Sequence, residues 1–180
     1  MPRYLQAERS APFTVRCTDV NVVLDLMIHD LDIVTDLAGS RPAEVSAAGA
    51  SVITKELDAV TARIRFENGC VSDVTASRVS DEKKRVLRVF DGDAVYSADY
   101  QTQKAVRSRP VSGTVPELRA EELPSERKDT LFEEVADFVR CVRGRSAPRV
   151  GGAEGRRALA LATLITSNIM EGRTGFTPVR

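Results

Sequence analysis

The side chains best suited to chemistry lie on one short segment of the chain. Asp25, His29, Asp32 and Asp36 follow one another at spacings of four, three and four residues, and His29 is the only histidine. At about 100° per residue, these positions fall on one stripe of an α-helix. An imidazole that titrates near neutrality, placed beside carboxylates, can transfer a proton. Two alternatives are a metal site formed by Asp25, His29 and Asp32, which the spacing signals only weakly, and a structural network of polar contacts.

The element that must position this stripe is a helix predicted over residues 19–39. Apolar residues cover most of its remaining circumference, which is typical of a buried helix. Charged side chains on a buried helix are costly unless they are paired or reached by water, and such a conflict tends to mark a functional site. Asp19 is the predicted N-cap, and Gly39 followed by Pro42 marks the end.

The pattern after this helix changes from helical to strand-like. Over residues 43–100 apolar and polar residues alternate, most clearly where Ala62, Ile64 and Phe66 alternate with arginines. Asn68-Gly69 is a hairpin signal, so successive strands are expected to pair antiparallel. Residues 101–127 are predicted to form one long edge strand and a loop.

Two further helices are predicted near the end of the chain. Thr130 and Glu133 have the spacing of a capping box, and Gly144 ends the helix that follows. The last helix is predicted over Glu154–Glu171. The order of elements predicts an α+β fold, an open antiparallel sheet with helices packed on one face.

The expected domain organisation is simple. Residues 1–18 form a lead-in segment from the boundary of a missing N-terminal domain, and residues 19–180 form a single α+β domain. Pro12 is expected to confine any extended structure in the lead-in to an edge or a bend.

Composition excludes several classes of protein. With 26 basic and 26 acidic residues the net charge is zero, which argues against a nucleic-acid binder. There is no apolar run long enough to span a membrane. Three widely separated cysteines without a CxxC pair argue against a disulfide framework and a structural zinc site. The cytoplasm is therefore the expected location.

Several short motifs together resemble a known family. The first is Asp25-x-x-x-His29-x-x-Asp32, and Gly39, Pro42 and Val45 follow it in order. The second is RIRFENGCVSDVTASRVS, and the third is the ending from LFEEVADFVRCVRG to NIMEG. From about Glu8 to the end, the chain resembles the C-terminal domain of the Gfo/Idh/MocA oxidoreductases, whose fold is like that of the glyceraldehyde-3-phosphate dehydrogenase C-terminal domain.

The resemblance implies a substrate site in this sequence, but it does not cover the family's nucleotide-binding domain. In that family an N-terminal Rossmann domain binds NAD(P), and this sequence has neither a GxGxxG after a strand nor a Glu-Lys-Pro motif. The glycines at 151, 152 and 155 lack the fingerprint spacing. By resemblance, Asp25 orients a substrate hydroxyl and His29 is the general acid/base.

Two more residues are candidate substrate ligands. Asp32 extends the stripe and can contact substrate, although pairing of Asp32 and Asp36 with Arg78 or another basic residue is the alternative. Arg78 can meet a substrate carboxylate or phosphate, and its alternative is a structural place on the sheet.

The predicted function is that of the substrate-binding and oligomerisation domain of a dehydrogenase acting on a sugar or polyol. It is expected to be inactive alone, to bind no cofactor by itself, and to work with a Rossmann-domain chain. The alternative is a non-enzymatic scaffold that binds partners or copies of itself. Either way, a homo-oligomer through the open sheet face is expected, with Ala62, Ile64 and Phe66 serving either the core or that contact.

Overall fold

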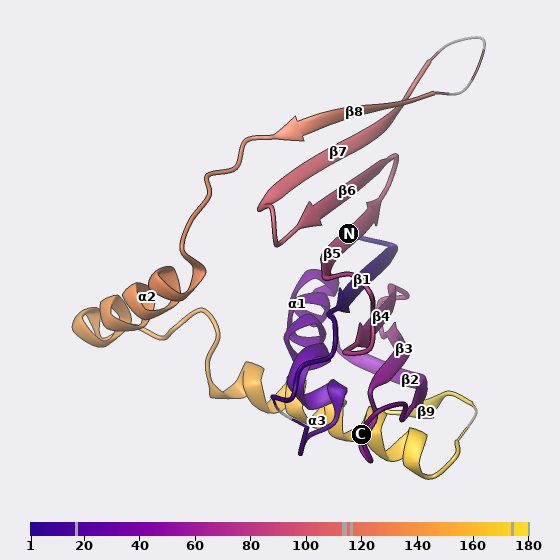
Figure 1. Ribbon diagram of the computed structural model, residues 1–180. Coiled ribbons are helices and arrows are strands. Elements are labelled where there is room, and N and C mark those ends of the chain that lie inside the picture. The colour runs from indigo at the N-terminus through magenta and orange to yellow at the C-terminus, as the bar shows by residue number, and fades with distance from the viewer. Residues whose placement is uncertain (17, 113–114, 116, 174, 180) are drawn as a thin grey trace.

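A single mixed sheet organises the molecule (Figure 1). The computed structural model describes residues 1–16, 18–112, 115, 117–173 and 175–179. In these residues nine strands are ordered β8-β7-β6-β5-β1-β4-β3-β2-β9. Their bounds are β1 Tyr4–Ser10, β2 Pro42–Ala50, β3 Ala59–Phe66, β4 Val71–Ser77, β5 Lys84–Asp91, β6 Ala94–Asp99, β7 Lys104–Val111, β8 Glu117–Leu123 and β9 Thr177–Pro178. All neighbours pair antiparallel except β1 and β4, which run parallel.

The strand β1 lies at the centre of the sheet, between β4 and β5. Leu5 and Ala7 are buried and alternate with less buried neighbours, as expected for a strand with one face on the core. The expectation of an edge or a bend for this segment is therefore wrong. The strand ends at Ser10, so Pro12 lies outside the ladder and removes no hydrogen bond from it.

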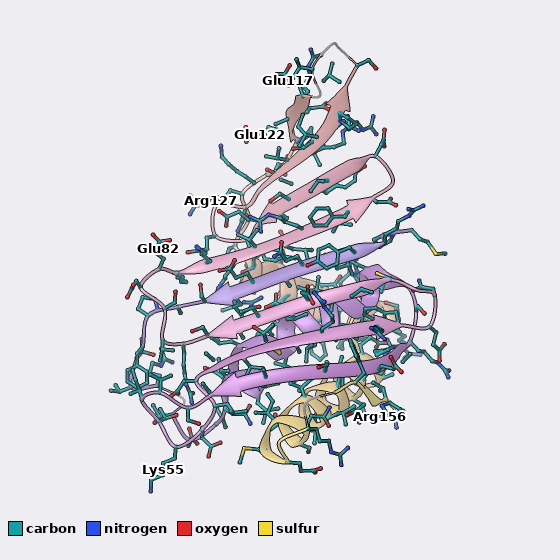
Figure 2. All side chains as sticks on the ribbon, turned by 90° about the vertical axis from the view of Figure 1, so that its right-hand side faces the viewer. Lys55, Glu82, Glu117, Glu122, Arg127 and Arg156 are labelled. Carbon is teal, nitrogen blue, oxygen red and sulfur yellow. The ribbon has the colours of Figure 1, made fainter. Side chains whose placement is uncertain are left out.

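One face of the sheet carries the core. The helices α1 (Ile28–Ala38) and α3 (Gly152–Met170) pack against each other, and α1 lies on β1 and β4 while α3 lies on β2. Ala62, Ile64 and Phe66 are in this core, which decides between the two roles expected for them. No helix of the described residues covers the opposite face, which Figure 2 shows. The α+β prediction with an open sheet is confirmed.

The helix that carries the stripe begins differently from the prediction. A π-helical turn, Val23–Met27, precedes α1. The Asn21 side chain, not Asp19, caps this turn, because its Oδ1 accepts from the amides of Val23 and Leu24 at 3.1 Å each. Gly39 ends α1 with φ of 58°, as its position after the apolar run indicates.

Burial along this helix is one-sided rather than complete. Met27, Leu31 and Val34 are fully buried, whereas Leu24 and Leu37 are exposed. The helix therefore presents a polar side to its surroundings, and the expected conflict between burial and charge is milder than the composition suggested.

The segment after β6 extends away from the core (Figure 1). Residues 101–127 form two strands, β7 and β8, rather than the single edge strand expected. Helix α2 (Thr130–Gly144) follows, and none of its residues is buried. Its N-cap is Asp129, whose side chain accepts from the amides of Leu131 and Phe132. The N-cap predicted at Thr130 is therefore wrong, and the helix is capped one residue earlier.

Candidate functional site

The stripe of ionisable side chains lies on the outer side of the π turn and α1. His29 and Asp36 are exposed, and Asp25 and Asp32 are half-buried. Asp25 belongs to the π turn, and the other three belong to α1. π-helical turns are rare and recur at functional sites. In the part of the chain that the structure describes, none of these four side chains has a hydrogen-bond or ion-pair partner. A structural network of polar contacts is therefore not their role within these residues.

A buried ion pair beneath the stripe fixes the rotation of α1 on the sheet. Arg9 on β1 grips Asp30 with two hydrogen bonds, Nε to Oδ2 at 2.6 Å and Nη2 to Oδ1 at 2.9 Å. Both side chains are nearly inaccessible to solvent. Because breaking such a pair leaves an uncompensated buried charge, the pair holds the stripe outward. Asp30 lies four residues before the buried Val34 and so on the buried side of the helix, a spacing that could have identified it in the sequence.

A cavity of about 620 Å³ opens beside the C-terminal half of α1. Asp32 and Asp36 line it, together with Tyr100 after β6 and with Arg149 and Arg157 near the start of α3. Burial raises the pKa of Tyr100, and the negative charge of Asp30 raises it further, so this phenol stays protonated and can donate. Carboxylates, guanidinium groups and a phenol among apolar side chains suit a polyhydroxylated ligand. The cavity lining does not include Asp25 or His29.

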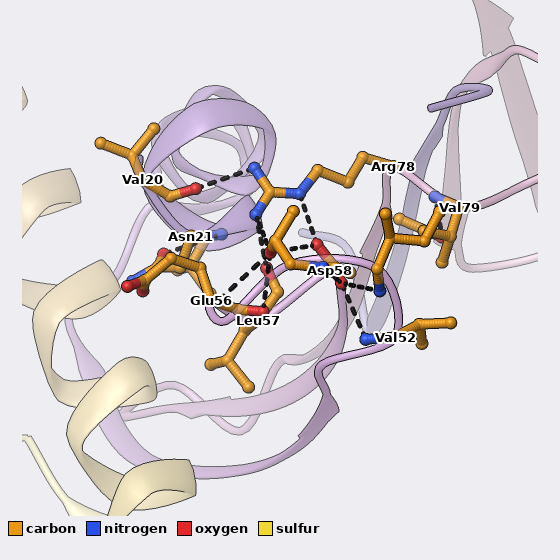
Figure 3. Close-up of polar contacts among 12 residues, drawn as sticks. Val20, Asn21, Val52, Glu56, Leu57, Asp58, Arg78 and Val79 are labelled. Atoms are coloured by element: carbon orange, nitrogen blue, oxygen red, sulfur yellow. Dashed lines mark hydrogen bonds and ion pairs between the residues drawn. The ribbon is translucent and has the colours of Figure 1, made fainter. Parts of the chain in front are cut away.

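Arg78 is placed elsewhere, in a buried network at the end of β4 (Figure 3). Its Nε donates to Asp58 Oδ1 at 2.8 Å and its Nη1 donates to the carbonyl of Val20 at 2.8 Å. Its Nη2 donates to Thr54 Oγ1 at 3.0 Å. The pairing of Arg78 with Asp32 or Asp36 is wrong, since Asp58 is its acidic partner. This position fits the structural alternative better than direct contact with substrate.

Asp58 is the centre of that network. Its carboxylate accepts from the amides of Val52, Ile53 and Thr54 at 2.7, 2.7 and 2.9 Å. Burial opposes its ionisation, but the hydrogen bonds from Thr54, Ile53 and Val52 outweigh burial and hold the pKa of Asp58 far below its usual range. Through Arg78, the network links Asp58 in the loop before β3 to the carbonyl of Val20, which precedes the π turn. It therefore helps to hold the start of the helix that carries the stripe.

The glycines that open α3 do not form a phosphate cradle. Gly151 and Gly152 open α3 after a loop rather than after a strand. The Gly151 amide, which a phosphate cradle would need, donates instead to Glu154 Oε2 at 2.9 Å. No group of three potential metal ligands occurs in the residues that the structure describes. No helix within these residues is long and apolar enough to cross a bilayer.

The fold defines a class of protein. A mostly antiparallel open sheet with helices on one face matches the C-terminal domains of dehydrogenases of solved structure. Residues 4–94 match the family described as the GFO/IDH/MocA C-terminal domain. The chain belongs to this family and is its C-terminal domain.

Relatives of known activity match almost all of the chain. A UDP-N-acetylglucosamine 3-dehydrogenase of Acidithiobacillus ferrooxidans is 38% identical over 164 residues, which are 89% of this chain and 52% of that protein. A myo-inositol 2-dehydrogenase of Thermotoga maritima is 25% identical over 85% of this chain and 48% of its own length. The chain therefore spans about half the length of these curated relatives.

Solved structures show the same fold. A structure of UDP-N-acetylglucosamine 3-dehydrogenase from Acidithiobacillus ferrooxidans matches with a TM-score of 0.87 at 36% identity, covering 94% of this chain and 55% of that one. Levoglucosan dehydrogenase, in complex with NADH and L-sorbose, matches with a TM-score of 0.83 over 99% of this chain and 58% of that one. At 14% identity, the second match shows the fold alone.

Proposed function

We propose that this chain is the substrate-binding and oligomerisation half of an NAD(P)-dependent dehydrogenase that acts on a sugar or polyol, and that it is inactive alone. The observation that carries the proposal is the outward stripe on α1, whose side chains have no partner among the described residues and whose Asp32 lines the neighbouring cavity. The two curated relatives are named for the oxidation of a nucleotide sugar and of a cyclitol. Both substrates are polyhydroxylated.

The roles follow from the chemistry of oxidising an alcohol. His29 takes the proton of the reacting hydroxyl, because a neutral imidazole is a suitable base near neutral pH. Asp25 lies one turn before it and orients that hydroxyl, and Asp32 accepts hydrogen bonds from other hydroxyls of the substrate. The hydride acceptor is NAD(P), which a nucleotide-binding domain outside these residues must hold. Arg78 has no place in direct substrate contact in this proposal.

The test is reconstitution with a Rossmann domain. The chain is mixed with, or fused to, the N-terminal half of the Acidithiobacillus enzyme, and NAD(P)H formation is followed with UDP-N-acetylglucosamine and with a panel of polyols. We expect activity from the combination and none from either half. His29→Gln should lower kcat by about 100-fold or more, as loss of a general base does.

Asp25 is tested with a matched control. Asp25→Asn should lower kcat strongly, whereas Asp19→Asn, which changes an exposed aspartate before the π turn, should leave it unchanged. Equal effects of the two variants, or full activity of His29→Gln, would contradict the proposed roles.

The second candidate function is that of a scaffold. The uncovered face of the sheet (Figure 2) favours it, because this face is extended and carries paired side chains such as Arg63 and Asp73. We propose that a second copy covers this face. Thr61→Arg, which adds a bulky charge to the face, should convert an oligomer to a monomer in light scattering. Thr18→Arg, at an exposed position outside the sheet, should not. A wild-type monomer at micromolar concentration would contradict this candidate.

A further inference from the structure

A second concave surface lies on the outer hairpin of β7 and β8, several strands away from the part of the sheet that α1 covers. This groove has a volume of about 480 Å³. Its lining includes three arginines, Arg107, Arg109 and Arg119, and one acidic residue, Glu121. Residues 107 and 109 point to the same face of β7, and their cross-strand neighbours are Glu121 and Arg119. The groove therefore has a clear excess of positive charge.

The pairing of charges across this hairpin is uneven. Arg107 forms an ion pair with Glu121, and Lys104 forms one with Glu122 at 3.2 Å. Arg109, in contrast, lies directly opposite Arg119. Like charges at directly opposite positions destabilise a strand pair. Within the described residues neither Arg109 nor Arg119 has a hydrogen-bond or ion-pair partner.

We infer that this arginine groove binds the diphosphate group of a small molecule. A bound anion would sit between Arg109 and Arg119 and offset their repulsion. The planar guanidinium group matches the spacing of phosphate oxygens and binds two of them at once. The volume lies in the range of small-molecule sites and exceeds what a single phosphate fills. Glu121 offsets the charge of Arg107, and the two remaining guanidinium groups match a ligand with more than one negative charge, which a diphosphate provides.

Calorimetric titration of the full 180-residue chain with inorganic pyrophosphate tests the site. The ionic strength is held at about 0.15 M so that unspecific attraction is screened. We expect saturable binding with one site per chain. The double variant Arg109→Gln/Arg119→Gln should bind about tenfold more weakly or worse.

A control variant separates the groove from net charge. Arg127→Gln/Arg156→Gln removes the same two charges from exposed positions outside the groove (Figure 2). Its affinity should stay within about twofold of wild type, because charges at a distance are screened. Absence of saturable binding up to about 10 mM pyrophosphate, or an equal loss in the control variant, would overturn the inference.

Two further ligands distinguish the source of the diphosphate. Tighter binding of UDP than of pyrophosphate would assign the groove to a nucleoside diphosphate, and equal binding would assign it to the diphosphate alone. Both results support the inference, and uridine without phosphate should not bind. UDP binding as tight in the Arg109→Gln/Arg119→Gln variant as in wild type would overturn it for that ligand.

Thermal unfolding gives an independent measurement. Without anion, the groove variant should unfold at a slightly higher temperature than wild type, because the repulsion between Arg109 and Arg119 is removed. Pyrophosphate should raise the midpoint of wild type by more than that of the variant. An equal rise in both proteins would contradict a site at these arginines. These tests need no second domain, so their outcome is separate from that of the proposed dehydrogenase function.

Discussion

The two halves of the sheet differ in how they are stabilised. The inner part, made of β1–β5, the π turn, α1, α3 and the loops between them, holds the core residues, including Leu5, Leu31, Ile64 and Ile165. In the outer part, made of β6–β8 and α2, the described residues contribute almost nothing to that core. The same chain thus contains a region that buries its apolar residues internally and a region that does not.

Helix α2 illustrates the difference most clearly. Its apolar residues recur at helical spacing, yet all of the large ones are exposed: Leu131, Phe132, Val135, Phe138, Val139 and Val142. An isolated helix of this length is marginal in water, and an amphipathic face is stable only when something covers it. Within the described residues, the inner part therefore carries the stripe and the core, whereas the apolar face of α2 stays exposed.

The largest effect is expected from the buried network behind the stripe. Arg78→Met leaves the Asp58 carboxylate buried without its guanidinium partner, so the free energy of unfolding should fall by about 3–5 kcal/mol. Urea denaturation measures it. Arg156→Met, at an exposed position on α3, is the control and should change it by less than about 0.5 kcal/mol. A loss below about 1 kcal/mol for Arg78→Met would mean that the network is not a support of the inner part.

Two leucines on α3 allow a buried and an exposed position of the same helix to be compared. Leu161 is 3% exposed and Leu159 is 50% exposed. Leu161→Ala should lower the free energy of unfolding by about 2–5 kcal/mol, because it leaves a cavity in the core. Leu159→Ala should change it by about 0.5 kcal/mol or less. Similar losses for the two variants would show that α3 packs differently from this account.

Acid should weaken the inner part through Asp58. Its pKa is depressed in the folded protein, so its contribution is fully present above the unfolded pKa of about 4. As pH falls below that value toward the folded pKa, this carboxylate alone makes unfolding easier by up to about 1.4 kcal/mol per pH unit.

Substitution isolates this contribution to the acid slope. Asp58→Asn should be less stable at neutral pH but should lose less stability between about pH 4 and pH 2 than wild type does. Asp19→Asn should follow the wild-type slope. Chemical denaturation at a series of pH values measures both, and identical slopes for Asp58→Asn and wild type would refute the assignment.

The smallest effect on stability is expected in the outer part. Phe138 is 61% exposed, so Phe138→Ser should change the free energy of unfolding of the inner part by about 0.5 kcal/mol or less. Phe66→Ser, in the core at 3% exposure, should lower it by about 3 kcal/mol or more. A large loss for Phe138→Ser in dilute monomer would show that α2 docks on the inner part, and the contrast between the two regions would then fail.

Local features of the fold could be predicted from the sequence, and long-range ones could not. The alternation at Ala62, Ile64 and Phe66 and the turn at Asn68-Gly69 are set by neighbours in the chain, and both appear as expected. The central place of β1 depends on parallel pairing with β4, more than sixty residues away. The alternation of apolar and polar residues within β1 does not indicate which distant strand pairs with it.

In the candidate site too, the features set by neighbouring residues could be predicted and those set by distant residues could not. Helical spacing places His29, Asp32 and Asp36 on one side of α1, since three residues of one helix need no tertiary information. The role of Arg78 could not be predicted, because its partner Asp58 lies twenty residues earlier in a loop. The cavity beside Asp32 also depends on α3, which the chain brings back from its far end.

The most direct test of the central claim is a fluorescence titration of the purified chain with NADH and NADPH. The claim is that these residues carry the substrate half of a dehydrogenase and leave the nucleotide to another domain. Because the diphosphate of either nucleotide can bind the arginine groove, the decisive titration uses the Arg109→Gln/Arg119→Gln variant. We predict no saturable change in fluorescence of this variant up to about 1 mM of either nucleotide. Saturable micromolar binding by the variant would contradict the claim, because a nucleotide site would then exist outside that groove.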